Sequence, residues 1–447
     1  MDFRDVFVAG VVLVSAAMAL KRPWIGVMLW TWLSVMSPHR YTWGFAHDAP
    51  LAAIAAGATL AGLLMTAEKQ SPFHGTPVRF FAVFTVWMTI SWLLGVDPVD
   101  DYWQWNKVIK VFLMTFVALA LLHNKIHIMA FGWVTAGSLA ILGAKGGVFT
   151  IAHGGSYRVW GPEGSFIEDN NEFALALIIT IPLLHFLQLQ VKRAGVRHLI
   201  SIAMLLCVAS ALGSHSRGGF LAMIAMGAMF WWRSPRKGPM GVLIAFVMLA
   251  MLPMMPEEWW ARMNTISEYE QDGSAMGRIN AWHVAFQVAL HNFFGGGMSY
   301  QYQYFFSLYG VYNQNITAAH SIYFQILGNH GFVGLVLYVA IWIATYRYAG
   351  WLRIHARSIP QAKWAADLGG MVQVGLVGFA AGGAFLSLAY FDLPYNMMVM
   401  VVLAKHWVET RGWEREPKMS FLEYAGLRRK RPEIGAGPAR QPAAGGH

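Results

Sequence analysis

The sequence predicts an all-helical, polytopic membrane protein. Hydrophobic residues make up 56% of its 447 residues and charged residues only 13%, whereas soluble globular chains carry about 25% charged residues. Apolar runs of roughly 15–25 residues recur from Val6 to Leu403, and a spanning helix needs ~20. Because helices satisfy their own backbone polar groups in lipid, we expect about 12 transmembrane helices and a helical loop domain outside the membrane.

The candidate spans are 6–20, 24–37, 49–66, 79–95, 107–123, 127–150, 172–190, 198–212, 218–232, 240–255, 320–346, 368–390 and 395–408. Thirteen runs would place the two termini on opposite sides. Twelve crossings is our working number, because the closely joined pair 6–20 and 24–37 and the short run after Pro394 are the weakest candidates.

Basic loops predict the orientation of the chain. The loops 191–198, 233–238 and 346–363 are rich in Lys and Arg and are expected on the cytoplasmic side. The intervening segments, including 153–172 and 256–319, then face outward. The same loops and the tail account for most of the net charge of +10, so we do not expect nucleic-acid binding. The single cysteine excludes an intramolecular disulfide.

These boundaries divide the chain into four parts. They are an N-terminal transmembrane bundle (1–255), a periplasmic loop domain (256–319), C-terminal transmembrane helices (320–410) and a cytoplasmic tail (411–447). The end of the tail is rich in Gly, Pro and Ala and is predicted to be disordered.

The stretch "GSHSRGGFLAM" (213–223) contains the first candidate site residues, Arg217 and His215. An Arg at the edge of a membrane helix either snorkels to mark the interface or serves a function. Function is favoured at an outward-facing end, where the positive-inside rule disfavours arginine. Serines and glycines around Arg217 leave the helix start open, and such a start with an Arg is typical of an anion site.

The second stretch, "GSAMGRINAWHVAFQVALHNFFGGGMSY" (273–300), predicts an amphipathic helix near the outer membrane surface. Helical spacing relates five apolar residues, Trp282, Ala285, Phe286, Ala289 and Phe293, and "GGG" is expected to end the helix. Arg278 is placed in its first turn. It is either a solvated surface charge or a second anion-binding group.

The third stretch is "AAHSIYFQILGNHGFVG" (318–334). On a helix, His320, Tyr323, Leu327 and Gly331 would share one face. Histidine can accept a proton near neutral pH, and His320 stands where a water-soluble reactant and a lipid would meet. The alternative is a structural, hydrogen-bonded histidine, a role that suits the deeper His330 better.

Weaker candidates follow from polar residues in unusual places. Arg158 and Asn171, the latter within "EDNNE" (168–172), either bind sugars or cap a helix. Lys145 either snorkels outward or aids an anion site, and Asp392 interrupts the last apolar region. Trp103 and Trp105 are expected to be belt residues at the membrane interface rather than a platform for sugars. The sequence contains no HExxH, CxxC, P-loop or carboxylate cluster, so we expect no metal or other cofactor.

Two arginines, a histidine base and a lipid-facing position together indicate one substrate class, a lipid that carries a diphosphate. The group beyond the phosphates would pass to an acceptor hydroxyl. Arginines would stabilise the departing diphosphate, and His320 would take the proton of the acceptor.

These three stretches, in this order, resemble the O-antigen ligase family. The segments "RPWIGVMLWTWLSVMSPHRYTWGFA" and "GPEGSFIEDNNEFALAL" also resemble the ligase-like branch associated with exosortase systems. The resemblance implies a GT-C-like, metal-independent, inverting glycosyltransferase of the bacterial inner membrane, with its active site facing the periplasm. Its donor would be a glycan on undecaprenyl diphosphate, and its acceptor lipid A-core.

The resemblance assigns catalytic roles to Arg217, Arg278 and His320. One departure is Ser321, where the family usually has Asn after the histidine. The acceptor stays open, since an O-antigen polymerase or a protein O-oligosaccharyltransferase would use the same chemistry. A transporter of lipid-linked sugars or anions is a third alternative. Transporters often show internal repeats and a midplane site, and neither is visible in the sequence.

Overall fold

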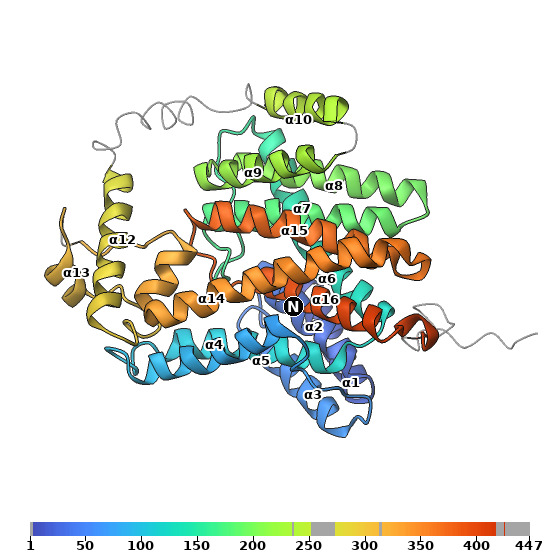
Figure 1. The fold of residues 1–447 in the computed structure, drawn as a ribbon, viewed down its shortest axis with the longest axis horizontal. Coiled ribbons are helices and arrows are strands. Elements are labelled where there is room, and N and C mark those ends of the chain that lie inside the picture. The colour runs from blue at the N-terminus through green and yellow to red at the C-terminus, as the bar shows by residue number, and fades with distance from the viewer. Residues whose placement is uncertain (1–2, 235–236, 252–272, 313–314, 417–423, 425–447) are drawn as a thin grey trace, which may run out of the picture.

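The computed structural model describes residues 3–234, 237–251, 273–312, 315–416 and 424, and these residues form helices and loops without a strand (Figure 1). The helices of the first half are α1 (Phe3–Lys21), α2 (Pro23–Met36), α3 (Leu51–Met65), α4 (Thr76–Leu93), α5 (Tyr102–Leu121), α6 (Lys125–Ala152), α7 (Asn170–Gln190), α8 (Ala194–Gly213), α9 (Arg217–Arg233) and α10 (Lys237–Met251). Those of the second half are α12 (Gly273–His291), α13 (Gln303–Tyr309), α14 (Ile322–His355), α15 (Lys363–Gly383) and α16 (Asp392–Glu409).

Each of the thirteen candidate spans overlaps one of these helices. Among the described residues, eight helices are long and apolar enough to cross a membrane; they are α1, α4, α5, α6, α7, α8, α14 and α15, the last two with their short flanking turns. The all-helical, multi-pass character is therefore confirmed, whereas the number of crossings stays a prediction. Pro23 separates the closely joined first pair by starting α2 directly after Arg22.

The apolar run 368–390 was predicted as one span, and this is wrong for its last part. The helix α15 ends at Gly383, and the chain then forms an irregular segment up to Phe391. This segment is largely buried, with Leu386, Leu388 and Ala389 each about 1% exposed. An apolar run indicates that its residues are buried, but not in which structure. Here the residues after Gly383 are buried inside the protein as an irregular segment rather than as part of a spanning helix.

The long helices pack around a core to which α7, α15 and α16 contribute most of their length. Nearly every side chain of α16 is buried. At one end of the bundle lie the first turns of α7, α9 and α14 together with α12; we call it the α7 end. At the opposite end, Gln190 hydrogen-bonds to Asp367 and Arg233 to the carbonyl of Gly370.

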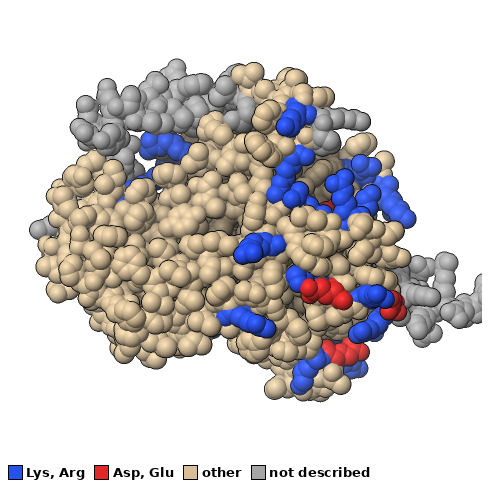
Figure 2. Space-filling view, viewed as in Figure 1, with Lys and Arg blue, Asp and Glu red and all other residues tan. Residues whose placement is uncertain are grey.

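Charge is distributed unevenly between the two ends. The basic loops 191–198 and 346–363 lie at the opposite end. Figure 2 shows Lys and Arg gathered toward the side where α14 ends and α15 begins, while the side around α12 and α13 is mostly uncharged.

A glycine turn clamps α12 to α14 at the α7 end. Gly331 kinks α14 with a φ of 68°, and Gly295, with a φ of 75°, lies so close that a Cβ there would meet the carbonyl of Asn329 at 2.4 Å. Only glycine permits both the left-handed backbone and this approach. The neighbouring His330 is fully buried, and its ring nitrogens lie 3.0 Å from the Ser91 hydroxyl and 2.7 Å from the Tyr390 hydroxyl. These contacts match the structural role expected for His330.

Candidate active site

His320 lies at the α7 end, two residues before α14 begins. Its backbone is left-handed, with a φ of 42°, and its side chain is 30% exposed. The expected helical face shared by His320, Tyr323 and Leu327 is therefore wrong, because the helix begins only at Ile322. The hydroxyl of Tyr323 instead donates to the carbonyl of Ala380, at 3.0 Å.

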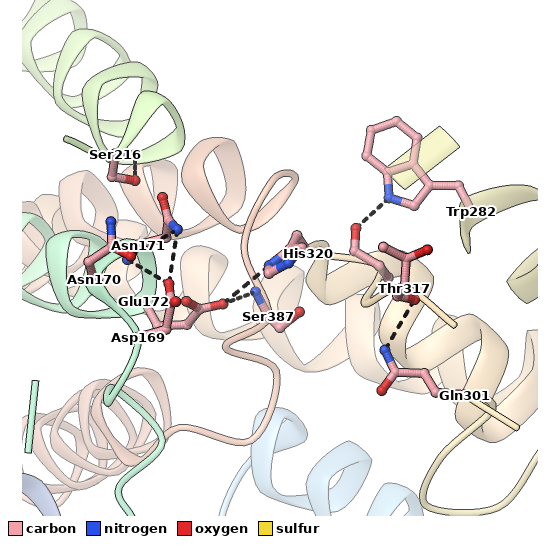
Figure 3. Close-up of polar contacts among 12 residues, drawn as sticks. Asp169, Asn170, Asn171, Glu172, Ser216, Trp282, Gln301, Thr317, His320 and Ser387 are labelled. Atoms are coloured by element: carbon pink, nitrogen blue, oxygen red, sulfur yellow. Dashed lines mark hydrogen bonds and ion pairs between the residues drawn. The ribbon is translucent and has the colours of Figure 1, made fainter. Parts of the chain in front are cut away.

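Glu172 faces His320 from the first turn of α7 (Figure 3). Its Oε1 lies 3.8 Å from the Nδ1 of His320 and accepts a hydrogen bond from the backbone N–H of Ser387, at 3.1 Å. A separation of 3.8 Å is too long for a hydrogen bond but brings the carboxylate close enough to stabilise a protonated imidazole. Ser387 belongs to the irregular segment after α15, so this segment helps to hold the carboxylate in place.

Sequence reasoning missed Glu172 as an individual residue. The stretch "EDNNE", to which it belongs, was predicted to bind sugars or to cap a helix, and the helix cap is confirmed. Asp169 caps α7, since its Oδ1 accepts from the backbone N–H of Asn171 at 2.8 Å. The side chain of Asn171 donates to the same oxygen at 2.9 Å. Burial, followed by the neighbouring Glu172 carboxyl, raises the pKa of Asp169.

Arg217 is the first residue of α9 and is half-buried. The side chain of Asn170 donates to the carbonyl of Ser214 at 2.6 Å, which joins the start of α7 to the turn before α9. A Cβ on Gly219 would meet the Cβ of Ala174 at 2.9 Å, so the two helices approach closely. The prediction of an open helix start is therefore wrong for this side of α9, where Gly219 is buried and its backbone N–H already donates to the hydroxyl of Ser216.

Arg278 lies on α12, in its second turn rather than its first, because the helix already begins at Gly273. Trp282, one turn further along the same face, donates to the carbonyl of Ala319 at 2.6 Å (Figure 3). Ala319 is the residue directly before His320. The helix that carries Arg278 is thus attached to the segment that carries the histidine.

The apolar stripe predicted for α12 is only partly correct: Ala285 and Ala289 are buried, but the two phenylalanines are not. Phe286 and Phe293 are 41% and 65% exposed, and the helix ends at His291, before Phe293 and the glycines. The residues that pack inward are Ala281, Val284, Ala285 and Val288. These small side chains, which include Ala285 of the predicted stripe, allow α12 to approach α14.

The remaining candidates have contacts of other kinds. His215 is buried, and its Nε2 lies 2.9 Å from the carbonyl of Gly155. Lys145 places its Nζ 4.0 Å from the ring centre of Tyr41. Asp392 is buried at the start of α16 and accepts from the hydroxyl of Ser34 at 2.7 Å.

Arg158 is half-buried in the loop before α7. Within the described part of the chain, neither this residue nor Lys145 or Asp392 makes a polar contact with His320 or Glu172. The structure therefore does not bring these three weaker candidates together with the histidine.

A cavity of about 430 Å³ adjoins Glu172 on the side of α5. Trp103, which was expected to be a belt residue, also lines this cavity. Trp105 stacks on Trp92 with ring centres 4.2 Å apart. In the part of the chain that the structure describes, His, Cys, Asp and Glu form no group of three or more placed to hold a metal ion.

Residues 202–339 match the family described as O-Antigen ligase. The chain carries an O-antigen ligase domain. This match includes Arg217, Arg278 and His320, the residues singled out from the sequence. Residues 3–192, which include Glu172, match a family of unknown function (DUF5935). A comparison with curated proteins gives no match.

Proposed function

We propose that this protein is a bacterial inner-membrane glycosyltransferase that moves O-antigen glycan from undecaprenyl diphosphate to a sugar hydroxyl of lipid A-core at the periplasmic face. The observation that carries the proposal is the pairing of His320 with the buried Glu172 at a separation of 3.8 Å. This pair lies at the less basic end of an apolar helical bundle. His320 belongs to the segment that matches the O-antigen ligase family, and Glu172 lies outside that segment.

The proposed reaction is a single displacement without a metal. The acceptor oxygen attacks the anomeric carbon of the donor sugar while His320 takes the hydroxyl proton on Nε2. The bond from the anomeric carbon to the diphosphate oxygen breaks, and the diphosphate leaves with the electron pair. Arg217 and Arg278 stabilise the charge on the leaving diphosphate, and Glu172 stabilises the imidazolium that forms. A single displacement inverts the anomeric configuration.

The acceptor has two further candidates, another lipid-linked O-unit and a protein hydroxyl. Both require the same histidine, arginines and donor. A transporter of lipid-linked sugars would have no need for a carboxylate directed at a histidine beside the membrane surface, so we place it behind the enzyme.

The test uses the purified full-length protein with a lipid-linked glycan donor and three separate acceptors: lipid A-core, a second lipid-linked unit and a peptide. We expect transfer to lipid A-core that persists in EDTA. Arg217→Ala should abolish or sharply lower transfer, and Arg217→Lys should restore only part of it, since lysine lacks the planar fork of arginine. His320→Ala should still bind the donor but lose the chemical step. His330→Ala is the comparison variant and should affect the chemical step much less.

Two outcomes would contradict the proposal. Normal transfer by Arg217→Ala would make the start of α9 purely structural. Loss of transfer in EDTA, restored by added divalent ions, would exclude the metal-free mechanism.

A further inference from the structure

The cavity beside Glu172 has the chemistry of a sugar-binding site. Its volume of about 430 Å³ falls within the ~300–1,000 Å³ that is usual for small-molecule sites. Aromatic, amide, hydroxyl and carboxylate groups line it together, among them Trp103, Gln104, Trp160, Ser165 and Glu168. A pyranose ring needs this combination, because its C–H face packs on aromatic rings and its hydroxyls donate to carboxylates and amides.

The two tryptophans present open ring surfaces. Trp103 is 64% exposed and Trp160 is 55% exposed. Neither indole hydrogen-bonds to, or stacks on, another residue that the structure describes. Their position on the cavity wall thus provides apolar surface without disturbing the packed core.

The loop that carries Trp160 is held in shape by its own contacts. The backbone N–H of Gly161 donates to the carbonyl of Glu168 at 2.9 Å, and the N–H of Gly164 donates to the Glu168 carboxylate at 2.8 Å. From α5, the Lys107 Nζ donates to the carbonyl of Gly164 at 2.9 Å. A loop fixed in this way loses little conformational freedom when a ligand binds.

The charge of the cavity argues against a diphosphate and for a hydroxyl-rich ligand. Glu168, Asp169 and Glu172 contribute three carboxyl groups to its lining. The lining also includes Lys107, whose amine already donates to the carbonyl of Gly164 and lies 4.3 Å from the ring centre of Phe166. Carboxylates repel phosphate oxygens but accept hydrogen bonds from sugar hydroxyls.

We propose that this cavity binds the sugar unit of the acceptor that receives the glycan, an inference that rests on the proposed transferase function. Glu172 belongs to the cavity wall and also faces His320, so a sugar in the cavity brings its hydroxyls to the base. A second cavity of about 260 Å³ shares Trp103, Lys107 and Ser165 with the first. It gives a longer oligosaccharide room to extend away from Glu172.

The experiment compares Trp160→Ala with Trp43→Ala in the full-length protein. Trp43 is 83% exposed and does not line this cavity, so it is the matched control. The binding probe is core oligosaccharide released from lipid A by mild acid, observed by saturation-transfer NMR. The kinetic measurement varies lipid A-core and the lipid-linked donor separately.

For Trp160→Ala we expect weaker oligosaccharide binding and an acceptor KM raised about tenfold, as for the loss of one good contact, with the donor KM and kcat little changed. Trp43→Ala should behave as wild type. An unchanged acceptor KM, or a raised donor KM alone, would overturn the assignment; the latter would place the donor glycan in the cavity. A wild type that binds the oligosaccharide through Trp160 but transfers nothing would support the sugar site and reject the proposed function.

Discussion

At the scale of single residues, the proposed chemistry depends on how Glu172 acts on His320. A carboxylate 3.8 Å from Nδ1 favours the ring orientation in which Nε2 is left to accept the proton of the acceptor. It also lowers the energy of the imidazolium that results. Glu172 does not touch the reacting atoms in this scheme, so it is a positioning residue.

The variant Glu172→Gln tests this role. Glutamine keeps an oxygen that can accept from the N–H of Ser387 but removes the charge, so the protein should fold while kcat falls about 10- to 100-fold. The donor KM should stay unchanged, because Glu172 lines the proposed acceptor cavity and is not one of the residues proposed to bind the diphosphate of the donor. The double variant Glu172→Gln/His320→Ala should be hardly less active than the single variant His320→Ala, since the two residues act as a unit.

Glu414→Gln is the control for this variant. It removes a carboxylate by the same substitution, at an exposed glutamate that pairs with Arg411 and lines neither of the cavities described above. This control should retain most of the activity. Wild-type turnover by Glu172→Gln would leave His320 without a partner in the mechanism.

The sequence revealed His320 and the two arginines but not Glu172, and the reason is physical. Ionisable residues at the ends of apolar runs are costly and therefore stand out. Glu172 lies in a run of capping residues, where an acidic side chain at a helix start is common. Its carboxylate accepts a hydrogen bond from Ser387, which is 215 positions further along the chain and falls within the run 368–390 that was predicted as a membrane span.

At the scale of elements, the position of the candidate site depends on the turn that joins α12 to α14. The carboxylate of Asp101, just before α5, supports this turn. Its Oδ2 accepts from the backbone N–H of Met298 at 2.7 Å and of Ser299 at 3.1 Å. The glycines at 295–297 are expected from the sequence to end a helix, but no local pattern links them to Asp101.

Asp101 should make the stability of the protein pH-dependent. Burial raises the pKa of its carboxyl in spite of the two backbone hydrogen bonds. The folded state therefore holds the proton more tightly than the unfolded chain. Its contribution to stability is fully present in acid and is lost as the pH rises through the folded-state pKa.

The measurement is the Tm of wild type and of Asp101→Asn, in detergent, from about pH 4 to about pH 7. Asparagine is neutral and can accept both N–H groups. The Tm of wild type should fall relative to that of the variant as the pH rises. A relative rise in the wild-type Tm would show that ionised Asp101 is the stabilising form.

At the scale of the whole molecule, the two ends of the bundle differ in charge and in chemistry. The basic loops 191–198 and 346–363 lie at the end opposite to His320, and Lys and Arg side chains gather there (Figure 2). From the positive-inside rule we expect that end to face the cytoplasm and the α7 end to face the periplasm. The uneven distribution of charge could be predicted from the sequence because it depends only on local composition, whereas the meeting of α7, α9, α12 and α14 depends on tertiary packing.

The proposed orientation can be tested with two single cysteines. The native Cys207 is buried, and Cys207→Ala provides the background. Val311, at the α7 end, is 62% exposed, and Arg357, at the opposite end, is exposed as well. In cells with a permeable outer membrane and an intact inner membrane, Val311→Cys should react with an impermeant maleimide and Arg357→Cys should not. Both should react after lysis, which shows that each thiol is accessible. The reverse pattern would put His320 on the cytoplasmic side, where the donor glycan and the acceptor proposed above could not meet it.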